Sequence, residues 1–338
     1  MKALDFKSIS KRTKIIIAAA AGVVVLAAIG AMIAIIANKH NIKTVARTKV
    51  LDGLDVLCAP NSIITDGEGG FLITDLYGKK IWRNVNGKSS VYVGADSVHD
   101  RYDEPIGGYN DATFDETLFA EPWAISPFLG GYAVTDTENN SVRLIRVEKG
   151  TQTINGESDV LEMGEYGVTF DHPTGLATDD DGNLYVSDTG RGAIRLITTE
   201  GDVETIADGL NAPTGLCYAG GTLYVAETGA NRILTVKDGN LQVIAGSGED
   251  GDKDGAAMSA SFSSPQGVAV AADGTIYVGD TVNASVRRII NGTVDTILSQ
   301  SDEVLETSPV SPTGVYVFEG NLYVCDYFSR MIYTLPIN

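Results

Sequence analysis

Short apolar runs alternate with turn residues along most of the chain, and their spacing repeats. A proline opens one run and an acidic residue closes a second run 14 or 15 residues later, in the pairs Pro60/Asp75, Pro122/Asp136, Pro173/Asp188, Pro213/Glu227, Pro265/Asp280 and Pro312/Asp326. An aliphatic residue stands two positions before each acid (Ile73, Val134, Val186, Val225, Val278, Val324) and six positions after it (Ile81, Val142, Ile194, Ile233, Val286, Ile332). This agreement indicates six copies of one structural unit.

Each copy predicts four antiparallel strands. In the third copy, β-type runs over 174–178 and 184–187 flank the turn Asp179–Asn183, whose Asp, Gly and Asn residues favour a hairpin. The chain then turns into a third run, 193–197, and a fourth, 203–207. Four strands in about 40–50 residues are typical of a propeller blade. The sequence therefore predicts an all-β fold, a six-bladed β-propeller of four-stranded blades.

The sixth copy contains three predicted strands, and a candidate for its fourth strand lies near the other end of the chain. Residues 44–54 resemble residues 203–210, because both segments end in Asp-Gly-Leu and lead into Ala-Pro. We expect residues 44–51 to close the last blade and to pair the sheet edges that an open array would expose. The predicted propeller therefore spans residues 44–338.

The order of strands in a blade also predicts which loops share a face. In a four-stranded antiparallel blade, the turn between the second and third strands and the link to the next blade lie at the same end. The long links are Ala95–Glu121, Gly156–His172, Ser247–Ser264 and Ser299–Ser311. We expect all of them on one loop-rich face, where a rigid scaffold commonly carries its function.

These residues resemble the NHL-repeat family. The pattern of that family is matched by Pro173-Thr-Gly175, Tyr185-Val186, Asp188-Thr189 and Ile194-Arg195, and again by Pro265-Gln-Gly267, Tyr277-Val278, Asp280-Thr281 and Val286-Arg287. Its spacer resembles Asp254-Gly255 with Ala260–Pro265 and, more loosely, Asn110–Ala112 with Phe119–Pro122. Blades one and six depart from the pattern with Asp75-Leu76-Tyr77 and Asp326-Tyr327-Phe328. The resemblance implies the fold, which hosts unrelated activities.

An uncharged stretch, Ile15–Ala37, precedes the repeats. As a helix its 23 residues would be about 34 Å long, enough to cross a hydrocarbon core of about 30 Å. The stretch is longer than the apolar region of a cleaved signal peptide, the alternative. We expect a single-pass membrane protein with a cytoplasmic tail (1–14), a signal-anchor helix (15–37), a linker (38–43) and a propeller outside the cytoplasmic membrane at the cell surface.

Composition narrows the classes of partner. The chain has 25 Lys+Arg against 44 Asp+Glu and a formal net charge of −19, which argues against nucleic acid. Its three cysteines, Cys58, Cys217 and Cys325, form no CxxC spacing and so give no zinc or redox motif. Cys217 and Cys325 lie in strand patterns that favour small buried side chains.

Two groups of acids could carry chemistry. The six acids that close the repeats occupy turn entrances, where we expect them to accept backbone N–H bonds. Asp250, Asp252 and Asp254 match the first half of a calcium loop, although Ser261 stands where a bidentate Glu would close it. We therefore expect no cofactor, with calcium at these three acids as the alternative.

Arginines and aromatic residues on the loop-rich face are candidates for ligand binding, since such residues often form the energetic centre of an interface. Those on or near turns and links are Trp123, His172, Arg191, Arg232, Tyr327, Phe328 and Arg330. The insert 96–116 adds Arg101, Tyr102 and Tyr109. Each of them could instead pair with or pack inside its own blade.

Three functional hypotheses follow. The first is a membrane-anchored domain that binds a protein, peptide or glycan through its loop-rich face without catalysis. The second is a hydrolase or lyase that uses carboxylates, with or without a divalent metal; related lyases use several histidines, whereas this chain has only His40, His99 and His172. The third is a sensor ectodomain that acts through a partner in the membrane.

Overall fold

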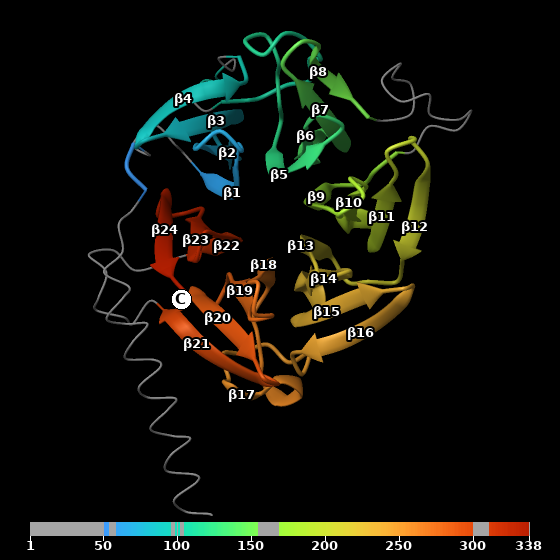
Figure 1. Ribbon diagram of the computed structural model, residues 1–338, viewed down its shortest axis with the longest axis vertical. Coiled ribbons are helices and arrows are strands. Elements are labelled where there is room, and N and C mark those ends of the chain that lie inside the picture. Colours follow the sequence, from blue (N-terminus) through green and yellow to red (C-terminus); the bar gives the residue numbers. More distant parts are fainter. Residues whose placement is uncertain are drawn as a thin grey trace, which may run out of the picture. The chain divides into compact units, whose positions relative to one another are not determined.

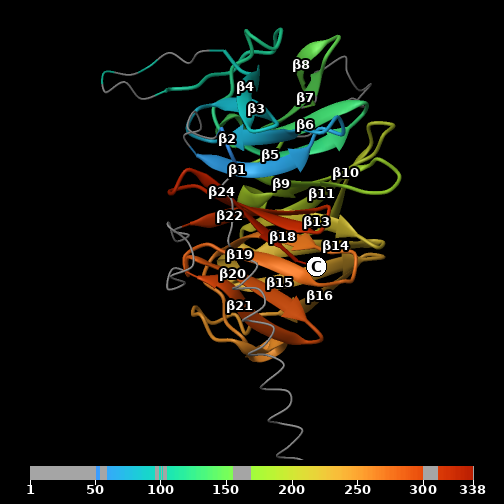
Figure 2. The same cartoon turned by 60° about the vertical axis from the view of Figure 1, so that its left-hand side comes forward.

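The computed structural model describes residues 51–53, 59–95, 99, 101, 105–154, 169–299 and 311–337. The predicted tail, membrane span and linker lie outside these residues. Within them, no helix is long and apolar enough to cross a bilayer. The described residues form six sheets arranged in a ring (Figure 1), which Figure 2 shows turned by 60° about the vertical axis. The predicted six-bladed architecture is confirmed.

Blades 1 to 3 each contain four consecutive antiparallel strands. Blade 1 comprises β1 (Pro60–Thr65), β2 (Phe71–Asp75), β3 (Lys80–Val85) and β4 (Lys88–Val93). Blade 2 comprises β5 (Pro122–Phe128), β6 (Gly131–Asp136), β7 (Ser141–Arg146) and β8 (Gly150–Thr153), with the 3-10 turn η1 (Thr137–Asn139). Blade 3 comprises β9 (Pro173–Thr178), β10 (Leu184–Asp188), β11 (Ala193–Ile197) and β12 (Val203–Ala207), with η2 (Thr189–Arg191).

Blades 4 to 6 continue the ring. Blade 4 comprises β13 (Pro213–Ala219), β14 (Thr222–Glu227), β15 (Arg232–Lys237) and β16 (Asn240–Ala245), with η3 (Thr228–Ala230). Blade 5 comprises β18 (Pro265–Val270), β19 (Ile276–Asp280), β20 (Ser285–Ile290) and β21 (Thr293–Ser299); β17 (Gly255–Ala256) extends its outer edge and η4 (Ala257–Ser259) follows. Blade 6 comprises β22 (Pro312–Phe318), β23 (Asn321–Asp326) and β24 (Met331–Pro336).

The core lies between neighbouring sheets. The twelve aliphatic residues that stand two positions before and six positions after the repeated acids are all fully buried. Ten of them belong to clusters that join adjacent blades, such as the cluster of blades 1 and 2 that contains Ile81, Val134 and Ile145. The repeat is therefore the spacing that a stack of twisted sheets needs in order to bury both faces.

Two features of the repeat, singly or together, tie blades 2 to 6 to the blades that follow them. At Gly175, Gly215, Gly267 and Gly314, two residues after the proline, an added Cβ would overlap a backbone carbonyl oxygen of the next blade, so only glycine lets the innermost strands approach. The threonine after the acid donates a hydrogen bond to the carbonyl of the next blade's proline at 2.7–2.8 Å, from Thr137, Thr189, Thr228 and Thr281. Leu76 and Tyr327 replace this threonine in blades 1 and 6.

The ring joins at the third strand of blade 6. The Leu51 amide donates a hydrogen bond to the Ile332 carbonyl at 3.2 Å, and the Leu51 side chain packs in the cluster between blades 6 and 1. Ile194 in blade 3 and Ile233 in blade 4 have the position that Ile332 has in blade 6. Each of these two residues pairs with the last residue of the outer strand of its own blade. Leu51 thus has the position expected at the end of a closing strand. Residues 44–50 lie outside the described residues, so the strand itself stays a prediction.

Candidate functional site

The six repeated acids are structural. Each accepts a hydrogen bond from a backbone amide in the link that precedes its own blade, donated by Ala59, Ala120, Asp171, Asn211, Ser263 and Ser311 in turn. Their side chains are almost completely buried. These bonds confirm the prediction that the acids stabilise turns, and they place the links and the second-to-third turns on one face, the loop-rich face.

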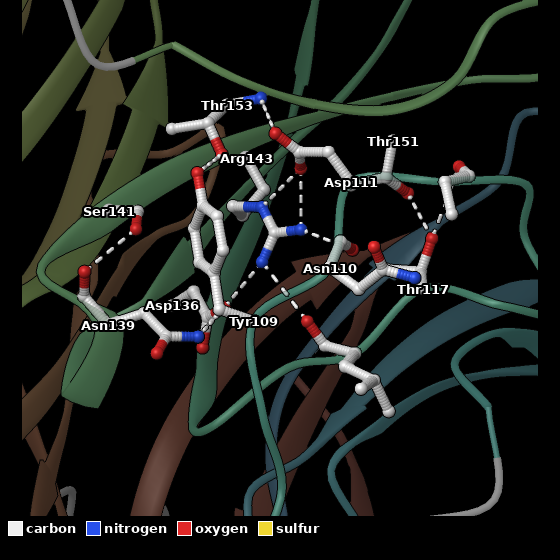
Figure 3. A network of polar contacts seen from close by, with 12 residues as sticks. Tyr109, Asn110, Asp111, Thr117, Asp136, Asn139, Ser141, Arg143, Thr151 and Thr153 are labelled. Carbon is white, nitrogen blue, oxygen red and sulfur yellow. Dashed lines mark hydrogen bonds and ion pairs between the residues drawn. The ribbon is translucent and has the colours of Figure 1, made fainter.

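A buried arginine fixes the insert before blade 2 (Figure 3). The Arg143 guanidinium contacts the carboxylates of Asp136 at 2.7 Å and Asp111 at 2.5 Å, and it donates to the Asn110 carbonyl at 2.8 Å. Its central carbon lies 4.7 Å from the centroid of the Tyr109 ring. Because Asp136 belongs to blade 2 and the other three residues to the insert, Arg143 holds the insert against the blade as an ordered part of the face.

The same arrangement recurs before blade 5 and involves the predicted calcium loop. Arg287 contacts Asp280 at 2.6 Å and Asp254 at 2.9 Å. Ser261 accepts a hydrogen bond at its Oγ from the Lys253 amide at 3.0 Å. Among the described residues, no group of three acids, histidines or cysteines could hold a metal ion. The arginine contact at Asp254 gives calcium binding no support, and calcium at Asp250, Asp252 and Asp254 stays a prediction.

The pKa of Glu121, on the loop-rich face, responds to charges from several blades. Burial raises the pKa of Glu121, Glu138 raises it further, and Lys79 and His172 lower it. Burial also raises the pKa of Tyr327, with a contribution from Glu121. Lys79 belongs to blade 1, Glu138 to blade 2, His172 to the link before blade 3 and Tyr327 to blade 6. We call these five residues the mouth cluster.

Of the predicted ligand-binding residues, four lie at or beside the mouth cluster. Tyr327 and Phe328 pack edge to face with ring centroids 5.0 Å apart, and Phe328 is 69% exposed. Trp123 is half-buried and lines the central channel. The His172 side chain is exposed, and its hydrogen bond with Asp171 at 2.8 Å raises the pKa of the imidazole. These residues place aromatic and ionisable groups on the loop-rich face and at the central channel.

Three predicted arginines differ in their surroundings. Arg191 contacts Asp188 at 3.1 Å, and Arg232 contacts Glu227 at 2.5 Å, so each guanidinium pairs with the acid of its own blade. Both of these arginines therefore serve the fold at least in part. Arg330 is exposed, and within the described residues no ion pair involves it.

The insert contributes less to the surface than predicted. Tyr109 is 55% exposed, but its hydroxyl bonds Thr153 at 2.8 Å and its ring lies against Arg143. Arg101 is exposed, whereas Tyr102 lies outside the described residues. Tyr109 is thus one of the residues around Arg143 through which the insert is held against blade 2.

Glu121, Lys79 and Glu138 of the mouth cluster were not predicted. A signal for Glu121 exists: it stands directly before a repeat proline, where His172 stands in the next blade and the other blades carry Ala59, Ala212, Ser264 and Ser311. Ionisable residues at this position therefore occur only in blades 2 and 3, which are adjacent. No comparable position in the repeat singles out Lys79.

The central channel is narrow. Its cavity of about 70 Å³ is lined by the innermost strands, including Asn61, Trp123, Gln266 and Thr313. Such a volume has room for about five water molecules. The channel itself is therefore too small for an organic substrate, which favours binding at the mouth.

The two described cysteines behave as expected. Cys325 is fully buried and Cys217 is partly buried; both are unpaired. Burial raises the pKa of the Cys217 thiol to about 11, so it stays protonated and unreactive near neutral pH. Cys58 lies outside the described residues.

Comparison with known proteins identifies the repeats. The profile of the teneurin NHL domain matches residues 163–319. NHL repeat-containing protein 2 of Bos taurus is 47% identical over 68 residues, which cover 20% of this chain and 9% of that protein. These matches and the ring of six blades together support an NHL-repeat β-propeller. Teneurin-3 of Danio rerio is 33% identical to it over 153 residues, covering 38% of this chain and 6% of teneurin-3. The matched segments thus cover less than a tenth of each of these two relatives.

Solved structures resemble the NHL propeller in fold. An auxiliary nutrient binding protein from Bacteroides thetaiotaomicron has a TM-score of 0.61 at 13% identity, covering 82% of this chain and 69% of that one. A streptogramin B lyase has a TM-score of 0.57 at 16% identity, covering 86% and 97%. At these identities the likeness concerns the fold alone, which serves both a binding protein and an enzyme.

Proposed function

We propose that this NHL propeller is an interaction domain that binds a protein or peptide on its loop-rich face, where blades 6, 1 and 2 surround the mouth cluster. One observation carries the proposal. Blade 6 has Tyr327 and the exposed Phe328 where blades 2 to 5 have a threonine that ties one blade to the next. The blade gives up a stabilising contact and gains an aromatic surface, as binding sites commonly do.

The surroundings of this aromatic pair suit a polar and charged partner segment. The exposed Arg330 lies in the same turn as the pair, and the mouth cluster supplies the Lys79 ammonium and the half-buried Glu121 carboxylate. Exposed aromatic side chains supply apolar contact area, while the charges favour one orientation of the ligand. The nutrient binding protein and the teneurin relative support a binding role by likeness.

The proposal includes membrane anchoring. Residues 15–37 form the uncharged stretch expected of a signal anchor, so the propeller would stand outside the cytoplasmic membrane with its N-terminus in the cytoplasm. External protease added to intact cells should then digest the propeller. Full protection of the propeller would contradict this location.

A photo-crosslinker tests the binding face in the full-length chain. With p-benzoylphenylalanine at position 328, irradiated cells should yield a discrete adduct with another protein, and Arg330→Ala should reduce its yield. The matched control carries the crosslinker at Leu241, an exposed residue of an outer strand in blade 4. Equal adducts from positions 328 and 241, or none from position 328, would contradict the proposal.

A further inference from the structure

A second cavity lies between blades 1 and 2, which are neighbours in the ring (Figure 1). Its volume is about 310 Å³, within the range of about 300–1,000 Å³ that small-molecule sites occupy. It is lined by residues of the β1–β2 turn and the β5–β6 turn. These turns lie at the blade ends opposite the long links, so this junction cavity is separate from the mouth cluster.

One wall of the junction cavity is a preformed polar clamp from blade 1. Arg83 donates from Nε to Asp66 at 2.7 Å and from Nη2 to Glu68 at 2.8 Å. Burial raises the pKa of Asp66, but hydrogen bonds from the amides of Glu68 and Gly70 and from Arg83 outweigh burial and lower it overall. Asp66 and Arg83 therefore form an ion pair near neutral pH, with the Glu68 carboxylate at its exposed end.

The other walls are aromatic and aliphatic. The rings of Tyr92 and Tyr132 stand nearly perpendicular, with centroids 6.4 Å apart, and Leu72 and Ile145 are fully buried beneath them. The Tyr132 hydroxyl donates to the Asp66 carbonyl at 3.1 Å, which fixes this ring next to the clamp. The cavity thus combines two aromatic faces with a row of charged hydrogen-bonding groups.

This combination selects a class of ligand. A cation would meet the Arg83 guanidinium, and an anion would meet the two carboxylates, so both charged classes are opposed. A neutral ring with several hydroxyls can donate to the exposed Glu68 carboxylate, accept from Arg83, which Asp66 holds in place, and lay its apolar C–H face on the tyrosines. We propose that the junction cavity binds a neutral saccharide.

The chain offers a matched control for the clamp. Arg83 pairs with Leu72 in the strand register of blade 1, and Arg288 has the same position in blade 5, where it pairs with Tyr277. Arg288 contacts Asp295 at 2.7 Å. Substitution of Arg288 therefore removes an equivalent ion pair without touching the junction cavity.

Binding to the purified full-length chain tests the proposal. The neutral probes are lactose, maltose, cellobiose and N-acetylglucosamine, and the charged probes are choline and glucuronate, measured by saturation-transfer NMR and calorimetry. We expect at least one neutral probe to bind more tightly than both charged probes. Glu68→Gln and Arg83→Gln should each weaken binding about tenfold, because each removes a charged hydrogen-bonding partner of the saccharide. Glu68 is exposed, so its substitution should leave the fold intact. Arg288→Gln should leave the affinity unchanged.

Three results would overturn the proposal. They are the absence of binding by all four neutral probes, tighter binding of choline or glucuronate, and equal weakening by Arg83→Gln and Arg288→Gln. The proposal is independent of the loop-rich face, so Phe328→Ala should leave saccharide affinity unchanged, and a loss in that variant would also count against it.

Discussion

Replacing Arg143 with alanine should lower the free energy of unfolding by about 3–5 kcal/mol, because removing one partner of a buried ion pair leaves the other charge uncompensated. The Arg143 and Asp136 side chains are both 0% exposed and lie 2.7 Å apart. The variant also loses the hydrogen bonds to the carbonyls of Asn110 and Leu118. Equilibrium urea unfolding measures the change.

Arg195 provides the matched control for Arg143. It stands seven residues after the acid of blade 3, as Arg143 does in blade 2, and contacts Asp188 at 3.1 Å, but its side chain is 22% exposed. Arg195→Ala should cost about 1 kcal/mol or less. In Arg143→Ala, amide exchange should also rise across residues 105–121. Similar small losses in both variants would show that Arg143 does not clamp the insert.

Replacing Gly314 with alanine should destabilise the chain by about 3 kcal/mol, at the upper end of the usual cost of overpacking. A Cβ at this position would overlap the backbone carbonyl oxygen of Asn61, which lies on the innermost strand of blade 1. Both groups belong to backbone, so neither can move without displacing its strand. The collision falls at the junction of blades 6 and 1, where Leu51 also bonds Ile332.

Ala124 has the position of Gly314 in blade 2 and already carries a Cβ. Ala124→Gly should cost about 1 kcal/mol, the ordinary penalty of glycine in a strand. Urea unfolding of both variants separates backbone collision from loss of a methyl group. A cost for Gly314→Ala no larger than that for Ala124→Gly would contradict close approach of the innermost strands.

The fold was predictable because each blade repeats one physical requirement. Ile73 and Ile81 of blade 1 recur as Val324 and Ile332 in blade 6, and all four are fully buried. Turn residues, strand periodicity and the position of the acids point to the same sheets. The strand expected over residues 44–51 differs, since it rests on resemblance to a single segment and only Leu51 is described.

The candidate site was predictable only in part. Tyr327 and Phe328 could be found because they break a repeat whose other members share a structural role. Arg191 and Arg232 could not be separated from Arg330 by sequence, because their pairing depends on how each side chain folds back on its own blade. The junction cavity needed coordinates, since its two walls come from different blades.

The central claim is that blade 6 departs from the repeat in order to bind, and Tyr327→Thr tests it most directly. The introduced threonine restores the residue that in blades 2 to 5 donates to the next blade's proline carbonyl. With p-benzoylphenylalanine at position 328 of the full-length chain, we expect the adduct to be lost while the free energy of unfolding stays equal or rises by about 1 kcal/mol. An undiminished adduct together with a less stable protein would mean that Tyr327 serves the fold, and would contradict the claim.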